Sequence, residues 1–253
     1  MTRVQDLIQH LHEELQISQI EDFGPNGLQV EGSDKPVTKV ATAVSTSLKT
    51  IHAAIKEKAQ VLIVHHGLLW SKDPLPIVGI KREKIKLLLD HEISLLAYHL
   101  PLDCHPKLGN NWKAAQDLGW TNLKPFGPKQ GELTLGVMGT FKEQSVEQFE
   151  KTLEVYYGHP AHTALGGASK VSSAALISGG AHREIHKAVA AGVDCYITGS
   201  FDEPIWDIAH EEHIHFFAMG HYNTETVGPK AIGSYLANKF NLEHKFLDIP
   251  NPF

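Results

Sequence analysis

The stretch Val61-Leu-Ile-Val-His-His-Gly67 contains the arrangement that decides the predicted fold. Four apolar residues, typical of a strand buried on both faces, lead directly into two imidazoles and a glycine. The stretch Ile93–Tyr98 repeats this order, because His99 follows it at once and Asp103 comes shortly after. Residues just beyond the carboxyl ends of strands line the ligand crevice of α/β sheets, so we expect these polar side chains to converge.

The second half of the chain follows the same plan. Strands are expected at 174–177, 195–198 and 214–219, with helices at 183–191 and 204–212. The last of these strands leads to His221 and Glu225, whose spacing places both on one face of a single helical turn. We interpret the repeated strand-helix-strand order as an internal duplication. The predicted fold is α/β: two related lobes with sheets flanked by helices, and a metal site in the cleft between them.

The lobe boundary is expected in a segment rich in turn-forming residues. Pro125, Gly127, Pro128 and Gly131 cluster there. The prediction is an N-terminal α/β lobe over 1–126, carrying the HHG and HxxxD residues, and a C-terminal α/β lobe over 127–253, carrying HxxxE.

Composition excludes several classes of protein. A formal charge of -6 over 253 residues argues against a nucleic-acid-binding surface, which needs clustered Lys and Arg. Segment 1–15 reads as an amphipathic helix with acidic residues and not as a signal peptide, and no apolar run is long enough to span a membrane. Cys104 and Cys195 are the only cysteines and form no CxxC pair, so we expect a protein of the reducing cytoplasm without disulfides.

Histidine is the unusual residue of this chain, with 17 copies. Three imidazoles and two carboxylates at predicted strand ends suit two divalent cations such as zinc, iron or manganese, one carboxylate bridging them. Two such ions can share and activate a water, which favours hydrolysis. The candidate ligands are His65, His66, Asp103, His221 and Glu225.

Two further sites are weaker candidates. His99 is placed to shuttle a proton or to hold a metal ligand in position, against a purely structural role at the strand end. The turn Ser178-Gly179-Gly180 follows a strand and precedes a helix, a geometry that offers backbone N–H groups to an anionic substrate. Plain tight-turn chemistry is the alternative there, and it is also the preferred interpretation of Asn26-Gly27.

Seven motifs follow one another along the chain: Gly24–Gly32, Val64–Gly67, Tyr98–Asp103, Gly109-Asn110, Ile177–Gly180, Ile197–Gly199 and Gly220–Glu225. Together and in this order they resemble the YbgI-like, or Nif-three-like, family, often labelled GTP cyclohydrolase I type 2 homologues. The resemblance implies a two-domain α/β fold, a toroidal homohexamer and a dinuclear site at the same five ligand positions.

The residues and the resemblance support more than one function. The first is a dinuclear metal-dependent hydrolase of a small nucleotide-like substrate, with ring-opening of GTP as the example that the family implies. The alternative is a metal-binding protein without catalysis, such as a metallochaperone or a regulator of a partner protein. A third interpretation keeps the histidines as structural residues. A Ser-His-Asp hydrolase is disfavoured because no G-x-S-x-G elbow is present.

Overall fold

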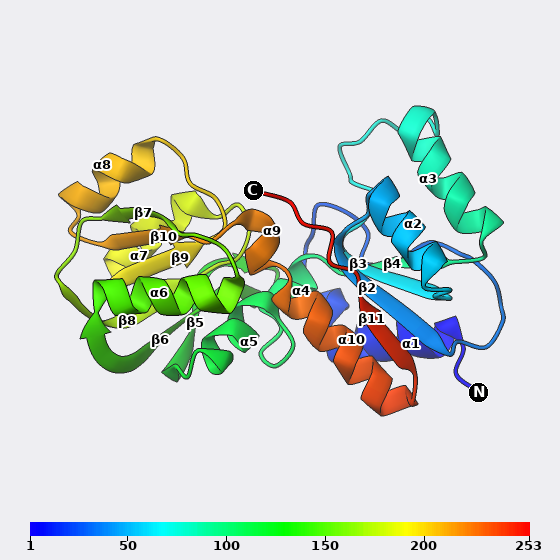
Figure 1. Cartoon of the computed structure of the whole chain (residues 1–253), viewed down its shortest axis with the longest axis horizontal. Coiled ribbons are helices and arrows are strands. Elements are labelled where there is room, and N and C mark those ends of the chain that lie inside the picture. The colour runs from blue at the N-terminus through cyan, green and yellow to red at the C-terminus, as the bar shows by residue number, and fades with distance from the viewer. The chain divides into compact units, whose positions relative to one another are not determined.

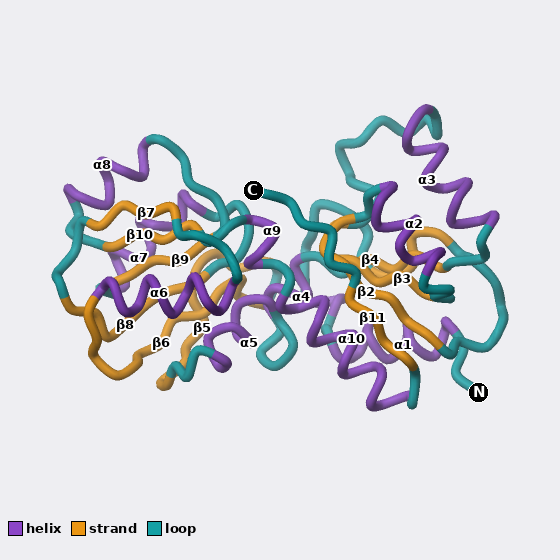
Figure 2. The backbone as a smooth tube through the Cα atoms, viewed as in Figure 1, coloured by secondary structure: helices purple, strands orange, loops and turns teal.

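The computed structural model describes residues 1–253 as two compact units. Unit 1 comprises Met1–Leu102, Gln130–Glu132 and Gly228–Pro250. Unit 2 comprises Asp103–Lys129, Leu133–Val227 and Asn251–Phe253. Each unit has one sheet covered by helices, so the mixed α/β class expected from the sequence is confirmed (Figures 1 and 2).

Unit 1 is built on a five-stranded sheet with the order β1-β4-β3-β2-β11. Strands β2, β3 and β4 are parallel, β11 pairs parallel to β2, and β1 pairs antiparallel to β4. The strands are β1 (Gly27–Val30), β2 (Lys39–Ser45), β3 (Val61–His66), β4 (Ser94–Ala97) and β11 (Glu243–Phe246). The helices are α1 (Val4–Glu14), α2 (Leu48–Lys56), α3 (Gly79–Asp90) and α10 (Val227–Phe240), and a 3-10 turn spans Ile17–Gln19.

Alternating side chains of β3 explain its unbroken apolar run. Val61 and Ile63 pack into one hydrophobic cluster with residues of α1 and α10. Leu62 and Val64 pack into another with residues of α2 and α3. Because both faces of the strand are covered, no position before the histidines accepts a polar residue. The start of α2 is set by Ser47, whose side chain accepts a hydrogen bond from the backbone N–H of Thr50.

Unit 2 has a six-stranded sheet with the order β5-β6-β8-β9-β10-β7. Strands β8, β9 and β10 are parallel, with residues of α5 and α6 in the core on one face and of α7 and α8 on the other. The strands are β5 (Thr121–Gln130), β6 (Leu133–Ser145), β7 (His162–Leu165), β8 (Lys170–Leu176), β9 (Cys195–Thr198) and β10 (His215–Ala218). The helices are α4 (Leu100–Cys104), α5 (Asn110–Asp117), α6 (Val146–Tyr157), α7 (Ile185–Ala191), α8 (Pro204–Glu211) and α9 (His221–Thr224), with a 3-10 turn at His182–Glu184.

The units do not divide at residue 126, where the sequence analysis placed the boundary. The proline- and glycine-rich segment belongs to β5. Prolines are tolerated there because β5 is an edge strand, where a missing backbone N–H does not interrupt the hydrogen bonds of the central strands. The C-terminal part of the chain returns to unit 1. There Ile232 and Leu236 of α10 pack with α1, and β11 extends the sheet beside β2.

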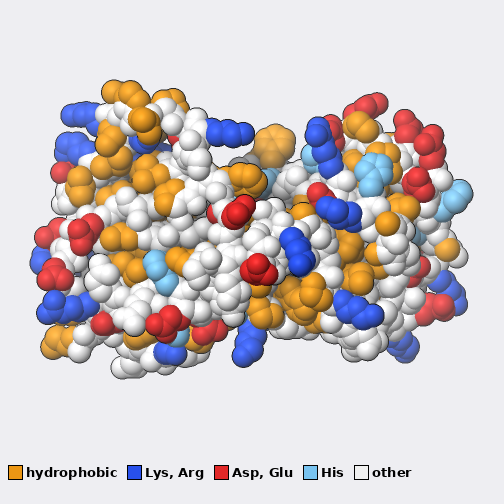
Figure 3. Space-filling model, turned by 180° about the vertical axis from the view of Figure 1, so that it is seen from behind, with side chains coloured by type: hydrophobic (Ala, Val, Ile, Leu, Met, Phe, Trp, Pro, Cys, Tyr) orange, Lys and Arg blue, Asp and Glu red, His pale blue; other side chains and the backbone are white.

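The surface shown in Figure 3 carries Lys and Arg interspersed with Asp and Glu, together with scattered apolar side chains. None of the helices combines the length and the apolar character needed to cross a membrane.

Stability should depend on pH through His244 of β11. Its Nε2 lies 2.8 Å from the hydroxyl of Thr42, and burial lowers the pKa of this imidazole. The unfolded chain therefore binds the proton more readily, and the contribution is complete above the ordinary imidazole pKa of about 6.5 and is lost as the pH falls below it. Urea unfolding of wild type and His244→Gln across this range should give stability curves that diverge at low pH in favour of the variant. Parallel curves would contradict this assignment.

Candidate metal centre

Three histidines of unit 1 meet at the carboxyl ends of two neighbouring strands. His65 and His66 are the last two residues of β3, and His99 lies two positions after the end of β4. The ring centroids are 4.8 Å apart for His65 and His66, 4.9 Å for His65 and His99, and 5.7 Å for His66 and His99. One ring nitrogen from each histidine lies within 4.8 Å of the others, so this group could hold a metal ion. The two consecutive histidines are the last residues of the strand itself, whereas the sequence pattern predicted them just beyond its end.

The Nδ1 atoms of the first two histidines are held by the protein. His65 Nδ1 lies 3.2 Å from the backbone carbonyl of Tyr98, which can only accept, so Nδ1 carries the proton and Nε2 the lone pair. His66 Nδ1 is hydrogen-bonded to the hydroxyl of Ser45 at 3.0 Å. Histidines that bind metals through Nε2 are held at Nδ1 in this manner, so the donor set fits a borderline divalent cation.

His99 is held by a carboxylate. Its Nδ1 lies 2.8 Å from Oδ1 of Asp22, whose side chain is only 3% exposed. Burial alone would raise the pKa of this carboxyl group, but the bonds and charge of His99, with smaller effects of Asn26 and the Phe23 N–H, bring the pKa below its ordinary value. The indole of Trp70 packs edge-on against the imidazole at 5.1 Å.

In unit 2, His221 and Glu225 lie at either end of the single turn α9, as their spacing predicts. His221 Nε2 is 3.3 Å from Glu225 Oε1, and His221 Nδ1 is 3.4 Å from the hydroxyl of Ser200. The Glu225 carboxylate is nearly buried while the His221 side chain is 40% exposed. One imidazole and one carboxylate are thereby paired beyond the end of β10.

Asp103 lies in α4 and is 5% exposed. Its Oδ1 accepts hydrogen bonds from Asn110 Nδ2 at 2.8 Å and from the hydroxyl of Ser178 at 3.0 Å. Two donors on one oxygen fix the rotation of the carboxylate, which is the support that a ligating carboxylate requires.

The Ser178–Gly180 turn differs from its predicted use as an anion site. The N–H of Ser178 donates to Asn111 Oδ1 at 2.7 Å, and that of Gly179 donates to the Thr224 hydroxyl at 3.0 Å. The N–H groups of Ser178 and Gly179 are therefore both hydrogen-bonded within unit 2, so they are not available to a substrate anion. Gly179 has φ +68, and a Cβ there would lie 2.3 Å from Glu225 Oε1. The turn instead makes room for the glutamate.

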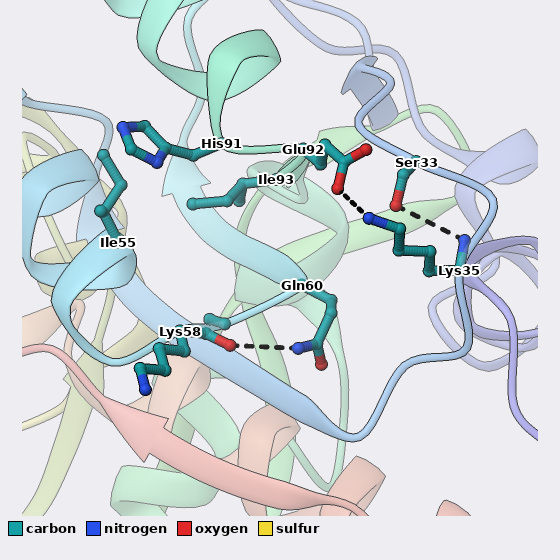
Figure 4. A pocket seen from close by; sticks show the side chains of 9 residues that line it. Ser33, Lys35, Ile55, Lys58, Gln60, His91, Glu92 and Ile93 are labelled. Carbon is teal, nitrogen blue, oxygen red and sulfur yellow. Dashed lines mark hydrogen bonds and ion pairs between the residues drawn. The ribbon is translucent and has the colours of Figure 1, made fainter.

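Each unit also contains a pocket. In unit 1 a pocket of about 310 Å³ lies beside Gln60 and Ile93, just before β3 and β4 begin, and therefore at the strand ends far from the histidines. Figure 4 shows Lys35 paired with Glu92 across it. In unit 2 a pocket of about 330 Å³ is lined by His159, His162, Phe201, Phe253 and the backbone next to His221, including Gly220.

Three imidazoles at the strand ends of unit 1, and an imidazole–carboxylate pair at a strand end of unit 2, define an α/β protein with candidate metal ligands in each unit. The chain belongs to the Duf34/NIF3 (NGG1p interacting factor 3) family, whose model matches residues 2–252. The resemblance drawn from the sequence motifs is confirmed by this match.

Relatives and solved structures cover the whole chain. A "GTP cyclohydrolase 1 type 2 homolog" of Chlamydia pneumoniae is 50% identical over 251 residues, 99% of each chain. A solved structure described as protein ybgI, of unknown function, is 35% identical with a TM-score of 0.93, covering 100% of both chains. The structure of TTHA1606 from Thermus thermophilus is 32% identical with a TM-score of 0.92, again covering 100% of both.

The supporting residues were not found from the sequence. Asp22 lies 77 positions from His99, and Ser200 lies 21 positions from His221. No local pattern marks either residue, because their partners are brought near only by the sheet. Asn26 carried a turn signal, yet its side chain also accepts the N–H of His99 at 2.8 Å. The Gly109-Asn110 motif and the Ser178–Gly180 turn each included a residue that supports Asp103, although neither pattern indicated that contact.

Replacing Gly179 with alanine should displace the Glu225 carboxylate and weaken zinc binding by on the order of 10-fold, as for other residues that support a metal ligand. Gly192→Ala is the matched control, because its φ of +67 carries the same strain while a Cβ there meets nothing within 4 Å. Both variants should lose about 1–2 kcal/mol of unfolding free energy from the left-handed backbone. Isothermal titration with zinc should separate them, and equal affinities would contradict the role given to Gly179.

Proposed function

We propose that the chain is a dinuclear metal-dependent hydrolase of a small, nucleotide-like substrate. The observation that supports it best is the position of His65 and His66 at the end of β3, where the Tyr98 carbonyl and the Ser45 hydroxyl hold their Nδ1 atoms. We assign His65, His66, Asp103, His221 and Glu225 as ligands of two divalent ions of zinc, iron or manganese. The fit rests on the donor chemistry: nitrogen and carboxylate oxygen without thiolate.

Two divalent ions, when bound, activate a water for attack and stabilise the negative charge that develops on the substrate. The chain supplies the remaining parts of the mechanism. Asn110 and Ser178 hold the Asp103 carboxylate, and Tyr98 and Ser45 orient the two consecutive imidazoles. His99 is our candidate for the group that accepts a proton from the attacking water and returns it to the leaving group.

The substrate assignment draws on the pocket beside Gly220. Its volume of about 330 Å³ suits a small molecule, and phenyl and imidazole side chains line it. Several curated relatives bear the name "GTP cyclohydrolase 1 type 2 homolog", which makes GTP the first compound to test.

Three expectations from the sequence remain proposals. The toroidal homohexamer rests on the family resemblance and would be tested by sedimentation velocity. A cytoplasmic location rests on cysteine usage. Internal duplication is supported by the topology, because β2-β3-β4 and β8-β9-β10 are both runs of three consecutive parallel strands joined by helices.

The decisive experiment measures metal content and GTP turnover on one untagged preparation after reconstitution with zinc, iron or manganese. Wild type should hold about two ions per chain and open the guanine ring. Glu225→Ala should lose turnover, because its buried carboxylate is assigned to the ions. Glu211→Ala, at an exposed position of α8, is the control and should match wild type.

The outcomes separate the alternatives. Two ions without turnover on GTP or on a panel of cyclic and phosphorylated substrates would favour the metallochaperone or regulatory function. Turnover that survives loss of Glu225 would remove the catalytic proposal. Wild type without stoichiometric metal would return the histidines to a structural role.

A further inference from the structure

Asp22 is the most fully hydrogen-bonded carboxylate near the histidines of unit 1. Oδ1 accepts from His99 Nδ1 at 2.8 Å and from the Phe23 N–H at 2.6 Å. Oδ2 accepts from the Leu100 N–H at 2.9 Å and from Asn26 Nδ2 at 2.8 Å. The carboxylate is thus tied to the ring of His99, to the N–H of the next residue along the chain and to its own loop before β1.

Three of these four groups can only donate a hydrogen bond. Backbone N–H groups and an amide nitrogen can only donate, whereas an imidazole nitrogen can donate or accept. A carboxylate can only accept when ionised, and the pKa of Asp22 is lowered. His99 must therefore place its proton on Nδ1, which leaves the lone pair on Nε2.

We propose that Asp22 is the positioning residue of His99: it fixes the imidazole in the tautomer that turns a lone pair on Nε2 toward His65 and His66. The inference rests on the proposed function in one respect, because the lone pair on Nε2 is taken to accept the proton of the attacking water. The carboxylate holds the ring in the orientation and the tautomer that leave Nε2 without a proton, which is the state that this role requires.

Other contacts fix the position of the His99 ring, but Asp22 alone selects its tautomer. The backbone N–H of His99 is held by Asn26 Oδ1, and the ring packs against Trp70 and Phe23 with centroids 5.1 and 6.2 Å away. These contacts fix where the imidazole lies. They do not select which nitrogen carries the proton, and that choice depends on Asp22.

Replacing Asp22 with asparagine should reverse the tautomer. The new NH₂ group takes the place of either Oδ1 or Oδ2. At Oδ2 it would face the Leu100 N–H and the Asn26 amide nitrogen, and neither of these can accept a hydrogen bond. At Oδ1 it would face the Phe23 N–H, which cannot accept, and His99 Nδ1, which can change from donor to acceptor. The amide therefore donates to Nδ1 of His99, and the ring proton moves to Nε2.

The test is the ¹⁵N–¹H spectrum of the histidine rings in the metal-free full chain, recorded above the ordinary imidazole pKa of about 6.5. The His99 signals are assigned by their loss in His99→Gln. Wild type should show Nδ1–H, Asp22→Asn should show Nε2–H, and Asp34→Asn, an exposed aspartate of the same unit, should match wild type. A wild-type ring with Nε2–H or with both nitrogens protonated would overturn the proposal, even if the variant failed to fold.

Hydrolysis gives the second readout. Asp22→Asn should lower kcat by roughly 10–100-fold while metal content stays at the wild-type value, as for other residues that orient catalytic imidazoles. A reversed tautomer with unchanged kcat would overturn the catalytic part. The spectrum needs neither metal nor substrate, so a protein that proves not to be a hydrolase would refute the proposed function and leave the tautomer result intact.

Discussion

Burial of parallel strands on both faces is the constraint on which the rest of the structure depends. Each central strand of unit 1 has helices above and below it, so nearly every side chain along its length is apolar. The buried Thr42 of β2 is the exception, and its hydroxyl is hydrogen-bonded to His244. Most polar side chains therefore lie at the strand ends. In β3 the transition takes place within one strand, from Val64 with no polar group to the imidazoles of His65 and His66. The candidate centre is a consequence of where burial stops.

The same constraint explains what could be predicted from the sequence. The strand cores, the helices between them and the polar residues at their ends are local patterns, and the structure has them within a few positions of the predicted bounds. The strand Cys195–Thr198 agrees residue for residue. His221 and Glu225 were related by helical spacing alone, and one turn of helix does bring them to 3.3 Å.

What failed to be predicted depends on contacts between distant segments. The division of the units was misplaced because α10 and β11 return to unit 1, and a short strand such as Glu243–Phe246 gives no sign of the sheet it will join. Asp22 and Ser200 are supports of the same kind, because their partners His99 and His221 lie far from them along the chain. Asn110 and Ser178 lay within sequence motifs, but no local pattern indicated their hydrogen bonds to Asp103. In the turn after β8, Gly179 leaves space for the Glu225 carboxylate.

The return of the chain to unit 1 also orders the events of biosynthesis. Strand β2 precedes unit 2 along the chain, whereas the strand that covers its outer edge, made of residues 243–246, is synthesised only after unit 2. Unit 2, by contrast, has all six of its strands between Thr121 and Ala218, with only Gln130–Glu132 of that stretch belonging to unit 1. The nascent N-terminal sheet therefore carries an open edge throughout synthesis of the other unit, which is the kind of surface that chaperones protect.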